Sequence, residues 1–372
     1  MDRRHRAVRW AAEFAAAARN ASRLVAGARL TDGQNLHSLA TDAETGLAEA
    51  RELFGLPPQW VIGRRLTTVG DVAVIELRNG TELAAVLKLS RSGCGDDSLL
   101  SQQRTLQRLA ADERLASWRR LLPEVVAHGM VASHVYSIES ALSGTVGTSI
   151  PHAAATDDAH RHALDAISGL HRATGRVETA SAELIDAWLE PALSLVAEVP
   201  ALFAGARRSS ALERVREELR AALEGRGVWV SSTHGDYFPG NIFYGPSNTV
   251  EGIIDWGQAR EDDPAVIDPM TLLLADRAGR QRSGIGGVVR DLCEGAPLSR
   301  RELALLEAHR AACPADPIPV DVMALLAWVR HVENNLRKSP RYAEHPVWIH
   351  RVVTPVLKSA GAPGPAPVLG RH

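Results

Sequence analysis

The chain has 372 residues, of which 45% are hydrophobic and 23% are charged, and this ordinary globular balance excludes a mostly disordered protein. Its formal net charge of −2 argues against a general nucleic-acid-binding protein, because such proteins are strongly basic. Three cysteines that lie far apart argue against a disulfide framework, and no apolar run reaches the roughly 18 residues of a membrane span. We therefore expect a cytoplasmic protein without a nucleic-acid or membrane partner.

Residues 1–58 are expected to form a helical extension. The apolar spacing over Met1–Ala28 predicts an amphipathic helix that packs on the main body, rather than a targeting peptide. Thr41 and Glu44 have the spacing of a capping box and predict the start of a second helix. Gly55 and the prolines after it are expected to end that helix.

Residues 59–139 are expected to form a small, sheet-rich lobe. The expected elements are strands over 69–77, 83–89, 125–126 and 135–139, and a helix over 98–118. Asn79-Gly80, between the first two strands, is typical of a tight hairpin turn.

Residues 140–360 are expected to form a larger, mainly helical lobe, and the Pro- and Gly-rich tail 361–372 to be disordered. Helical spacing occurs at 155–172, 182–196, 210–223, 300–312, 320–336 and 348–357. Two strand candidates, 228–230 and 250–254, interrupt the helices. The sequence therefore predicts an α+β fold of two lobes, and ligands often bind between lobes.

Polar residues that could carry chemistry follow both strands of the larger lobe. His234-Gly235-Asp236 opens an H-x-D-x-x-x-x-N motif that closes at Asn241, and Asp255 ends the next hairpin strand. Phosphoryl transfer needs one carboxylate that accepts the proton of a hydroxyl, and a carboxylate and an amide oxygen that hold Mg²⁺. Each residue taken alone could instead stabilise a turn. Their order, however, is that of the catalytic loop and D-F-G segment of kinases.

Lys88 is the candidate residue from the smaller lobe. It lies between Leu87 and Leu89 in the second strand of the predicted hairpin. Only three of the 42 basic residues are lysine, so a retained lysine points to chemistry that arginine does not perform. In the functional interpretation its ammonium group binds nucleotide phosphates, and in the alternative it is an exposed edge-strand residue.

The segments His234–Asn241 and Ile254–Trp256 resemble the aminoglycoside phosphotransferase and choline kinase-like family of small-molecule kinases. The resemblance covers about residues 59–350 and implies a protein kinase-like two-lobe fold, to which residues 1–58 are an addition. It implies that Asp236 is the catalytic base and that Asn241 and Asp255 bind Mg²⁺.

The resemblance also implies where the nucleotide, ATP or GTP, is held. Lys88 would bind its phosphates. The interlobe segment 139–142 would contact the nucleobase through its backbone, with Glu139 and Ala141 as the contacting residues. His171 matches the Leu-His end of a helix in the family. Asp268 matches the last aspartate of its D-P-x-x-D-L segment, and that aspartate is usually structural. His234 is expected to brace the catalytic loop by hydrogen bonds.

Two departures from the family pattern concern the phosphate site. No G-x-G-x-x-G loop covers the phosphates, and Thr67–Asp71 stands at that turn. The glutamate that usually pairs with the strand lysine is missing from the following helix, where Gln102 and Gln103 stand. Glu113 lies too late in that helix, so the sequence leaves the partner of Lys88 open.

The acceptor is expected to be a small hydroxyl compound. Only residues 257–262 separate the Asp255 segment from Asp263-Pro264, and no A-P-E motif follows, so a platform for a peptide substrate is missing. From Asp321 onward seven Lys and Arg residues stand against three acidic ones. This excess favours a neutral or anionic acceptor over a polycation, unless the arginines only form a solvated face.

Our leading hypothesis is an enzyme that uses ATP or GTP and Mg²⁺ to phosphorylate a hydroxyl of a small molecule, such as an antibiotic, a sugar or an amino alcohol. The alternative is a catalytically weak, kinase-like module that senses nucleotide or binds a partner. A third interpretation is a metal-dependent hydrolase that uses His234, Asp236 and Asp255.

Overall fold

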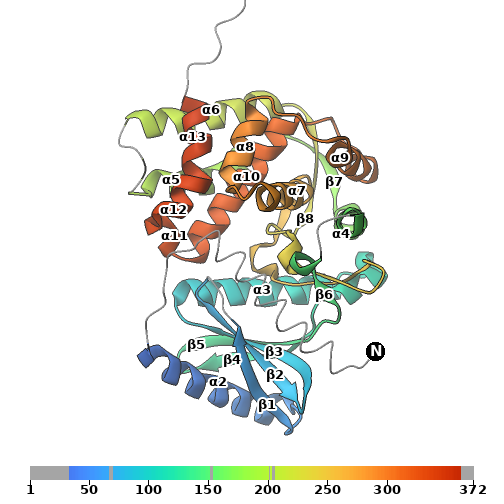
Figure 1. Cartoon of the computed structure of the whole chain (residues 1–372), viewed down its shortest axis with the longest axis vertical. Coiled ribbons are helices and arrows are strands. Elements are labelled where there is room, and N and C mark those ends of the chain that lie inside the picture. The colour runs from blue at the N-terminus through green and yellow to red at the C-terminus, as the bar shows by residue number, and fades with distance from the viewer. Residues whose placement is uncertain (1–32, 67–69, 151–153, 201, 203–205, 362–372) are drawn as a thin grey trace, which may run out of the picture.

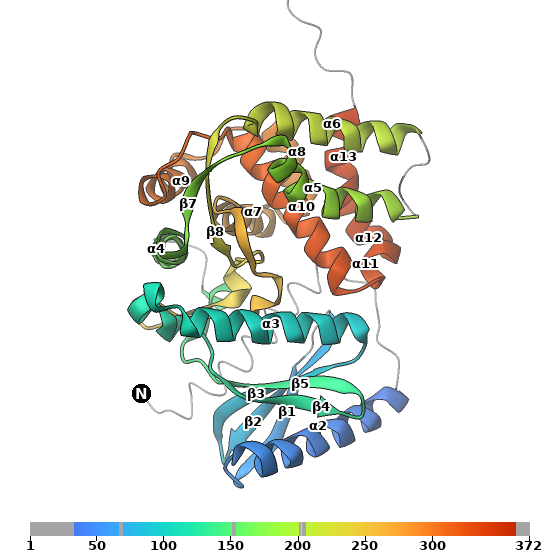
Figure 2. The same ribbon diagram turned by 180° about the vertical axis from the view of Figure 1, so that it is seen from behind.

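The computed structural model describes residues 33–66, 70–150, 154–200, 202 and 206–361. A sheet-based N-terminal lobe and a larger helical C-terminal lobe lie one above the other along the longest axis (Figures 1 and 2). This arrangement confirms the predicted α+β fold of two lobes.

Within the described residues, the N-terminal lobe contains a five-stranded antiparallel sheet in the order β1-β2-β3-β5-β4. Its strands are β1 (Trp60–Leu66), β2 (Val72–Asn79), β3 (Glu82–Ser90), β4 (Val125–Val131) and β5 (His134–Ser140). Asn79 pairs with Glu82, and Gly80 between them has a φ of +60°, so the predicted hairpin turn is confirmed.

Two helices cover this sheet from opposite sides, α2 (Gly33–Phe54) and α3 (Gly93–Ala111) (Figures 1 and 2). Helix α2 passes through Thr41 without a break, so the predicted helix start at Thr41 is wrong. No residue from 33 to 40 interrupts the helix, and its packing on the sheet stabilises it. It ends as predicted, before Gly55, whose φ is +65°. The helix predicted over Met1–Ala28 lies outside the described residues.

Helix α3 begins five residues before its predicted start because Ser92 caps it by accepting a hydrogen bond from the N–H of Gly95 at 3.3 Å. It also ends early. Asp112 separates it from the 3₁₀ turns of η1 (Glu113–Leu121), which are interrupted by Ala116 at a φ of +42°.

The C-terminal lobe is built from helices around one large apolar core. Those predicted correspond to α4 (Ala154–Thr174), α5 (Ala182–Glu198), α6 (Ala206–Leu223), α9 (Arg300–Ala312), α10 (Val320–Lys338) and α13 (Thr354–Gly361). Shorter turns precede α13, namely α11 (Arg341–Glu344), α12 (Pro346–Trp348) and η5 (Ile349–Val353). Two helices were not predicted, α7 (Ile267–Gln281) and α8 (Ile285–Cys293). Most of α7 is buried, and its buried residues include the polar Asp268, Thr271 and Asp276, which interrupt the apolar pattern on which a prediction would rest.

Two small sheets of the C-terminal lobe carry the polar motifs. In the described part of the chain, one sheet has the order β10-β9-β6 and the other the order β11-β8-β7. Their strands are β6 (Thr145–Val146), β7 (Arg176–Thr179), β8 (Gly227–Thr233), β9 (Ile242–Tyr244), β10 (Val250–Ile253) and β11 (Arg260–Pro264). Short helical turns connect them, η2 (Gly147–Ser149), η3 (Pro239–Asn241) and η4 (Trp256–Gln258). None of the helices described here is both long and apolar enough to cross a membrane.

Candidate functional site

The loop that follows β8 is held in place by a buried carboxylate. Asp268 accepts hydrogen bonds from the backbone N–H groups of His234 at 2.7 Å and Gly235 at 2.8 Å. Its oxygen Oδ2 also accepts from His171 Nε2 at 3.0 Å, and these groups are inaccessible to solvent. Asp268 and His171 therefore position the loop, which agrees with the structural role expected for Asp268.

Gly235 takes a conformation that other residues would strain. Its φ is +77°, and a Cβ atom there would lie 2.3 Å from the carbonyl oxygen of Gln258. The glycine thus lets the segment after β10 pass directly over the loop that carries Asp236.

His234 joins the two polar loops, as expected for a bracing residue. Its Nδ1 accepts a hydrogen bond from the N–H of Asp236 at 3.2 Å, so Nε2 carries the proton and donates to the carbonyl of Ile254 at 2.9 Å. The ring is buried and lies 4.5 Å from that of Trp256. The imidazole is therefore engaged at both nitrogens, which leaves neither free for proton transfer to a ligand.

Asn241 and Asp255 lie side by side because they flank the same hairpin. Ile242 of β9 pairs with Ile253 of β10, and the N–H of Ile254 donates to the carbonyl of Asn241 at 2.9 Å. The amide nitrogen of Asn241 donates to the backbone carbonyl of Asp236 at 2.9 Å. This bond fixes the orientation of the carboxamide and leaves its oxygen available as a ligand.

Asp255 is the most strongly perturbed carboxylate of this group. It has a left-handed backbone, with φ 66° and ψ 56°. The ammonium group of Lys338 is the main reason that its pKa is lowered to about 2, and Lys88 acts in the same direction. An anionic oxygen beside an amide oxygen is a donor set that suits Mg²⁺.

Lys88 finds its acidic partner on a strand rather than on a helix. Its ammonium group lies 3.0 Å from Oε2 of Glu139, and both side chains are largely buried. Gln102 of α3 donates to the other oxygen of the same carboxylate. In β3 and β5, Val86 pairs with Glu139, and this register places Glu139 near Lys88. The missing helix glutamate is therefore matched by a carboxylate on β5.

Ala141 lies just beyond β5, where the chain leaves the sheet for the C-terminal lobe. Its N–H points toward the carbonyl of Ala84 at 3.4 Å. In the structure the side chain of Glu139 pairs with Lys88. The expected contact of Glu139 and Ala141 with a nucleobase through their backbone stays a prediction.

Helix α10 adds three residues that the sequence motifs did not identify, His331, Asn334 and Lys338. Their spacing of three and four residues places them on one face of the helix. Asn334 Nδ2 donates to the carbonyl of Gly235 at 2.8 Å, and Lys338 Nζ lies 3.4 Å from Oδ2 of Asp255. The sequence signal was a run of polar residues at helical spacing within an otherwise apolar helix.

The side chains of α10 that face the loop after β8 are largely buried and lie close to charged groups. Burial lowers the pKa of His331, while Asp236 opposes this effect. Arg330, on the adjoining side of the helix, is buried and pairs with Asp263 of β11 and with Glu333. These ion pairs anchor α10 against β11, so its polar face is fixed beside Asp236.

A second cluster, outside this site, has the residue types of a metal site. His171, His309 and Cys313 have ligand atoms within 4.8 Å of one another. His171 Nε2, however, donates to Asp268, and its Nδ1 lies 2.9 Å from Nε2 of His309. Because burial raises the pKa of the Cys313 thiol to about 11, a hydrogen-bonded core explains this cluster better than a metal site.

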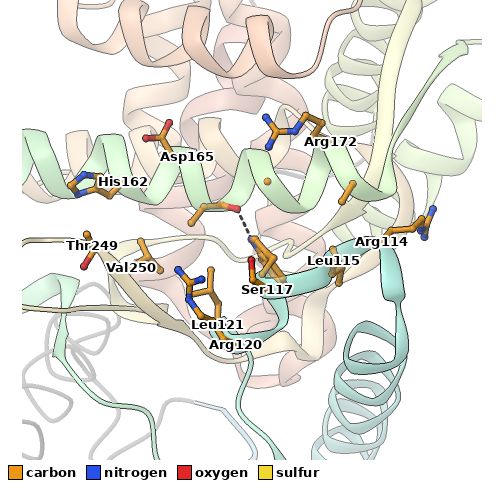
Figure 3. A pocket seen from close by; sticks show the side chains of 14 residues that line it. Arg114, Leu115, Ser117, Arg120, Leu121, His162, Asp165, Arg172, Thr249 and Val250 are labelled. Carbon is orange, nitrogen blue, oxygen red and sulfur yellow. Dashed lines mark hydrogen bonds between the residues drawn. The ribbon is translucent and has the colours of Figure 1, made fainter.

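A surface cavity of about 620 Å³ lies between η1, α4 and the segment that leads into β10 (Figure 3). Arg114, Arg120 and Arg172 are among its lining residues, and Trp118, which also lines it, donates to the carbonyl of Ala166 at 2.7 Å. None of the site residues predicted from the sequence lines this cavity. It is therefore separate from the group formed by Asp236, Asn241 and Asp255.

Comparison with known families identifies this arrangement. Residues 71–303, more than half of the chain, match the model of the phosphotransferase enzyme family. The chain belongs to this family. It is an enzyme of the small-molecule kinase type, as the resemblance implied. No curated protein matches the sequence.

Solved structures of phosphotransferases share the fold. The structure is similar to an aminoglycoside-3'-phosphotransferase of type VIII, with 17% identity and a TM-score of 0.50 over 78% of this chain and 99% of that chain. It is also similar to the GDP and kanamycin complex of APH(2")-IIia, with 15% identity and a TM-score of 0.51 over 84% and 97%. A glucosamine kinase has 17% identity and a TM-score of 0.41 over 85% and 79%. The first two of these structures confirm the protein kinase-like fold of this phosphotransferase.

Proposed function

We propose that this phosphotransferase moves the γ-phosphoryl group of ATP or GTP to a hydroxyl of a small, neutral or anionic molecule. The observation that carries the proposal is the meeting of Asp236, Asn241 and Asp255 at one end of the β9–β10 hairpin, close enough to Lys88 for its charge to act on Asp255. The structure of APH(2")-IIia likewise holds a nucleotide, GDP, together with a small molecule, kanamycin.

Asp236 is the proposed base. Its backbone is held on both sides, by His234 and by Asn241, whereas its carboxylate makes no hydrogen bond to any residue that the structure describes. A fixed but unoccupied carboxylate can orient an acceptor hydroxyl and take its proton as the oxygen attacks phosphorus.

Asn241 and Asp255 are the proposed ligands of Mg²⁺, because both offer hard oxygen atoms and they stand at the same end of the β9–β10 hairpin. When bound, Mg²⁺ neutralises charge on the nucleotide phosphates. Lys88 is proposed to bind the phosphates from the other lobe, in an orientation set by Glu139. The backbone of Ala141 is proposed to contact the nucleobase.

The charges of the C-terminal region support an acceptor that is not a polycation. Glu333 is fully buried and is enclosed by three arginines, Arg260, Arg330 and Arg337. Asp321 begins α10, about 25 Å along the helix from its last residue. Two of the three acidic residues of this region are therefore unavailable to a cationic acceptor at the catalytic loop.

Metabolite-wide phosphorylation tests the proposal. The purified protein is incubated with ATP or GTP and Mg²⁺, and metabolites that gain the mass of a phosphoryl group are identified. The Asp236→Asn variant should bind nucleotide as the wild type does but transfer about 10²–10⁴-fold more slowly, because it lacks the base. Unchanged turnover in this variant would remove the base assignment.

The same assay addresses the other interpretations. A hydrolase would release phosphate from esters without any nucleotide. A nucleotide-sensing module would bind nucleotide and phosphorylate nothing. The missing glycine-rich loop and the open partner of Lys88 favoured such a module, and the ion pair of Lys88 with Glu139 answers the second of these points.

A further inference from the structure

Lys338 is a cation of the candidate site that the sequence motifs did not include. It is one of only three lysines, beside 39 arginines, and it is the last residue of α10. Its ammonium group lies 3.4 Å from Oδ2 of Asp255, and 28% of its side chain is exposed. This contact leaves other donors of the ammonium group without a partner among the described residues.

The stem of Lys338 passes across the start of β2 in the other lobe. A Cβ atom at Gly70 would lie 3.1 Å from Cε of Lys338, so the missing side chain at Gly70 makes room for the stem. The next residue, Ser339, donates to Oδ1 of Asp71 at 3.3 Å. Gly70 and Asp71 directly precede β2. Lys338 therefore reaches the site between these residues and Asp255.

Lys338 also lies near the proposed base. Asp255 and, to a smaller extent, Asp236 raise the pKa of Lys338, so the ammonium group is within the field of both carboxylates. A phosphoryl group in transfer must lie between the residue that orients the acceptor and the residue that holds the metal ion. The ammonium group of Lys338 lies 3.4 Å from Oδ2 of Asp255, and Asn334, on the same face of α10, donates to the carbonyl of Gly235, the residue before Asp236.

We infer that Lys338 is a second phosphate-binding lysine, which contacts the γ-phosphoryl group while Lys88 binds the phosphates nearer the nucleoside. This inference rests on the proposed function. The lysine forms no covalent bond; it contributes positive charge and hydrogen bonds to the equatorial oxygens of the group in transfer. A slender stem and a compact charge suit the narrow space beside Gly70 better than a guanidinium group does.

Affinity for a triphosphate relative to a diphosphate tests the inference. Dissociation constants of AMP-PNP and ADP, each with Mg²⁺, are measured by calorimetry for the wild type and for Lys338→Met. The variant should lose about tenfold or more in affinity for AMP-PNP while ADP affinity changes by less than about threefold, because only AMP-PNP carries the γ-group.

Two matched variants separate this role from others. Lys358→Met removes the exposed lysine of α13 and should leave both dissociation constants unchanged. Ser339→Ala removes the contact between the lobes at Asp71 and keeps the charge of Lys338. If Lys338 were only a tie between the lobes, Ser339→Ala would reproduce the effect of Lys338→Met on both nucleotides.

Each result decides a different point. If the wild type binds neither nucleotide, the proposed function fails. If the wild type binds both and Lys338→Met weakens them equally, or weakens neither, the inference fails and the proposed function stands. Thermal melting verifies that each variant is folded, and should Lys338→Met not fold, Lys338→Gln is held to the same criterion.

Discussion

The acidic partner of Lys88 is Glu139, which lies on strand β5. In the family this partner usually comes from the helix that follows the lysine strand. A buried lysine needs a carboxylate beside it, because an unpaired charge in the core is strongly destabilising. The helix position offers Gln102, which is neutral, and the carboxylate comes from β5 at 3.0 Å. Gln102 then serves as a donor to the same carboxylate.

This arrangement predicts that a carboxylate at position 102 can replace the one at position 139 as the partner of Lys88. Glu139→Gln should lower the free energy of unfolding by about 3 kcal/mol and weaken MgADP binding, because Lys88 loses its partner. The double variant Gln102→Glu/Glu139→Gln returns a carboxylate from the helix and should recover more than half of both losses. Urea unfolding and calorimetry measure these effects, and a double variant no better than the single one would contradict the prediction.

At the scale of an element, the catalytic loop depends on one glycine. Gly235→Ala should lower the free energy of unfolding by more than about 2 kcal/mol and abolish turnover, since a Cβ atom would meet a carbonyl oxygen at 2.3 Å. Gly225→Ala is the matched control, because Gly225 has a φ of +78° but no atom within 4 Å of the added Cβ. Gly225→Ala should lower the free energy of unfolding by about 1 kcal/mol and leave turnover intact. Equal losses in urea unfolding for the two variants would refute this account.

Helix α2 belongs energetically to the sheet, although its residues precede the region matched by the family model. Ala43, Leu47 and Ala50 are buried in the same apolar cluster as the strands. Leu47→Ala should therefore lower the free energy of unfolding by about 2–5 kcal/mol, as expected for a cavity in a core. Leu53→Ala on the same helix, where 66% of Leu53 is exposed, should change it by less than about 0.5 kcal/mol. Similar values for the two variants, measured by urea unfolding, would show that α2 does not pack as described.

The whole molecule is joined by contacts that cross between its lobes. Helix α3 lies between the sheet and the helical lobe (Figure 2), and Gln102 reaches the sheet from it. At the far end of α10, Lys338 and Ser339 contact the turn before β2. Nucleotide binding to residues of both lobes should therefore stabilise the protein as a unit.

The acid stability of the whole molecule should depend on His309. Burial lowers the pKa of His309 from 6.5 to about 3. The unfolded chain takes up a proton there below about pH 6.5, whereas the folded protein does so near pH 3, so folding stability present above pH 6.5 is lost as the pH falls through this window.

The size of this effect follows from about 1.4 kcal/mol per pH unit. Between pH 7.5 and 5, wild-type stability should fall by about 2 kcal/mol more than that of His309→Gln, in which the amide can still donate to His171. Urea unfolding at both pH values measures the difference, with His350→Gln as the exposed control. Parallel losses in wild type and His309→Gln would exclude His309 as the titrating group.

Local signals account for much of what the sequence predicted correctly. The hairpin at Gly80, the strands beside it and most helices of the larger lobe could be predicted from the spacing of apolar residues and from residues that form turns or end helices. These signals act over a few positions along the chain. Asp236, Asn241 and Asp255 were predicted as site residues because they stand next to strands in a compact motif. The start of α2 was mispredicted because a capping signal at Thr41 is weaker than the packing of the whole helix on the sheet.

The sequence by itself determined the two-lobe organisation and the polar residues after β8 and β10, because these depend on neighbours along the chain. Only the tertiary structure decided that Glu139 pairs with Lys88 and that Lys338 reaches Asp255. The first contact depends on the register between β3 and β5, and the second joins residues 83 positions apart. Contacts between residues so far apart in the sequence produce no local sequence pattern. They form only when the complete core has packed, because that packing supplies the energy that holds them in place.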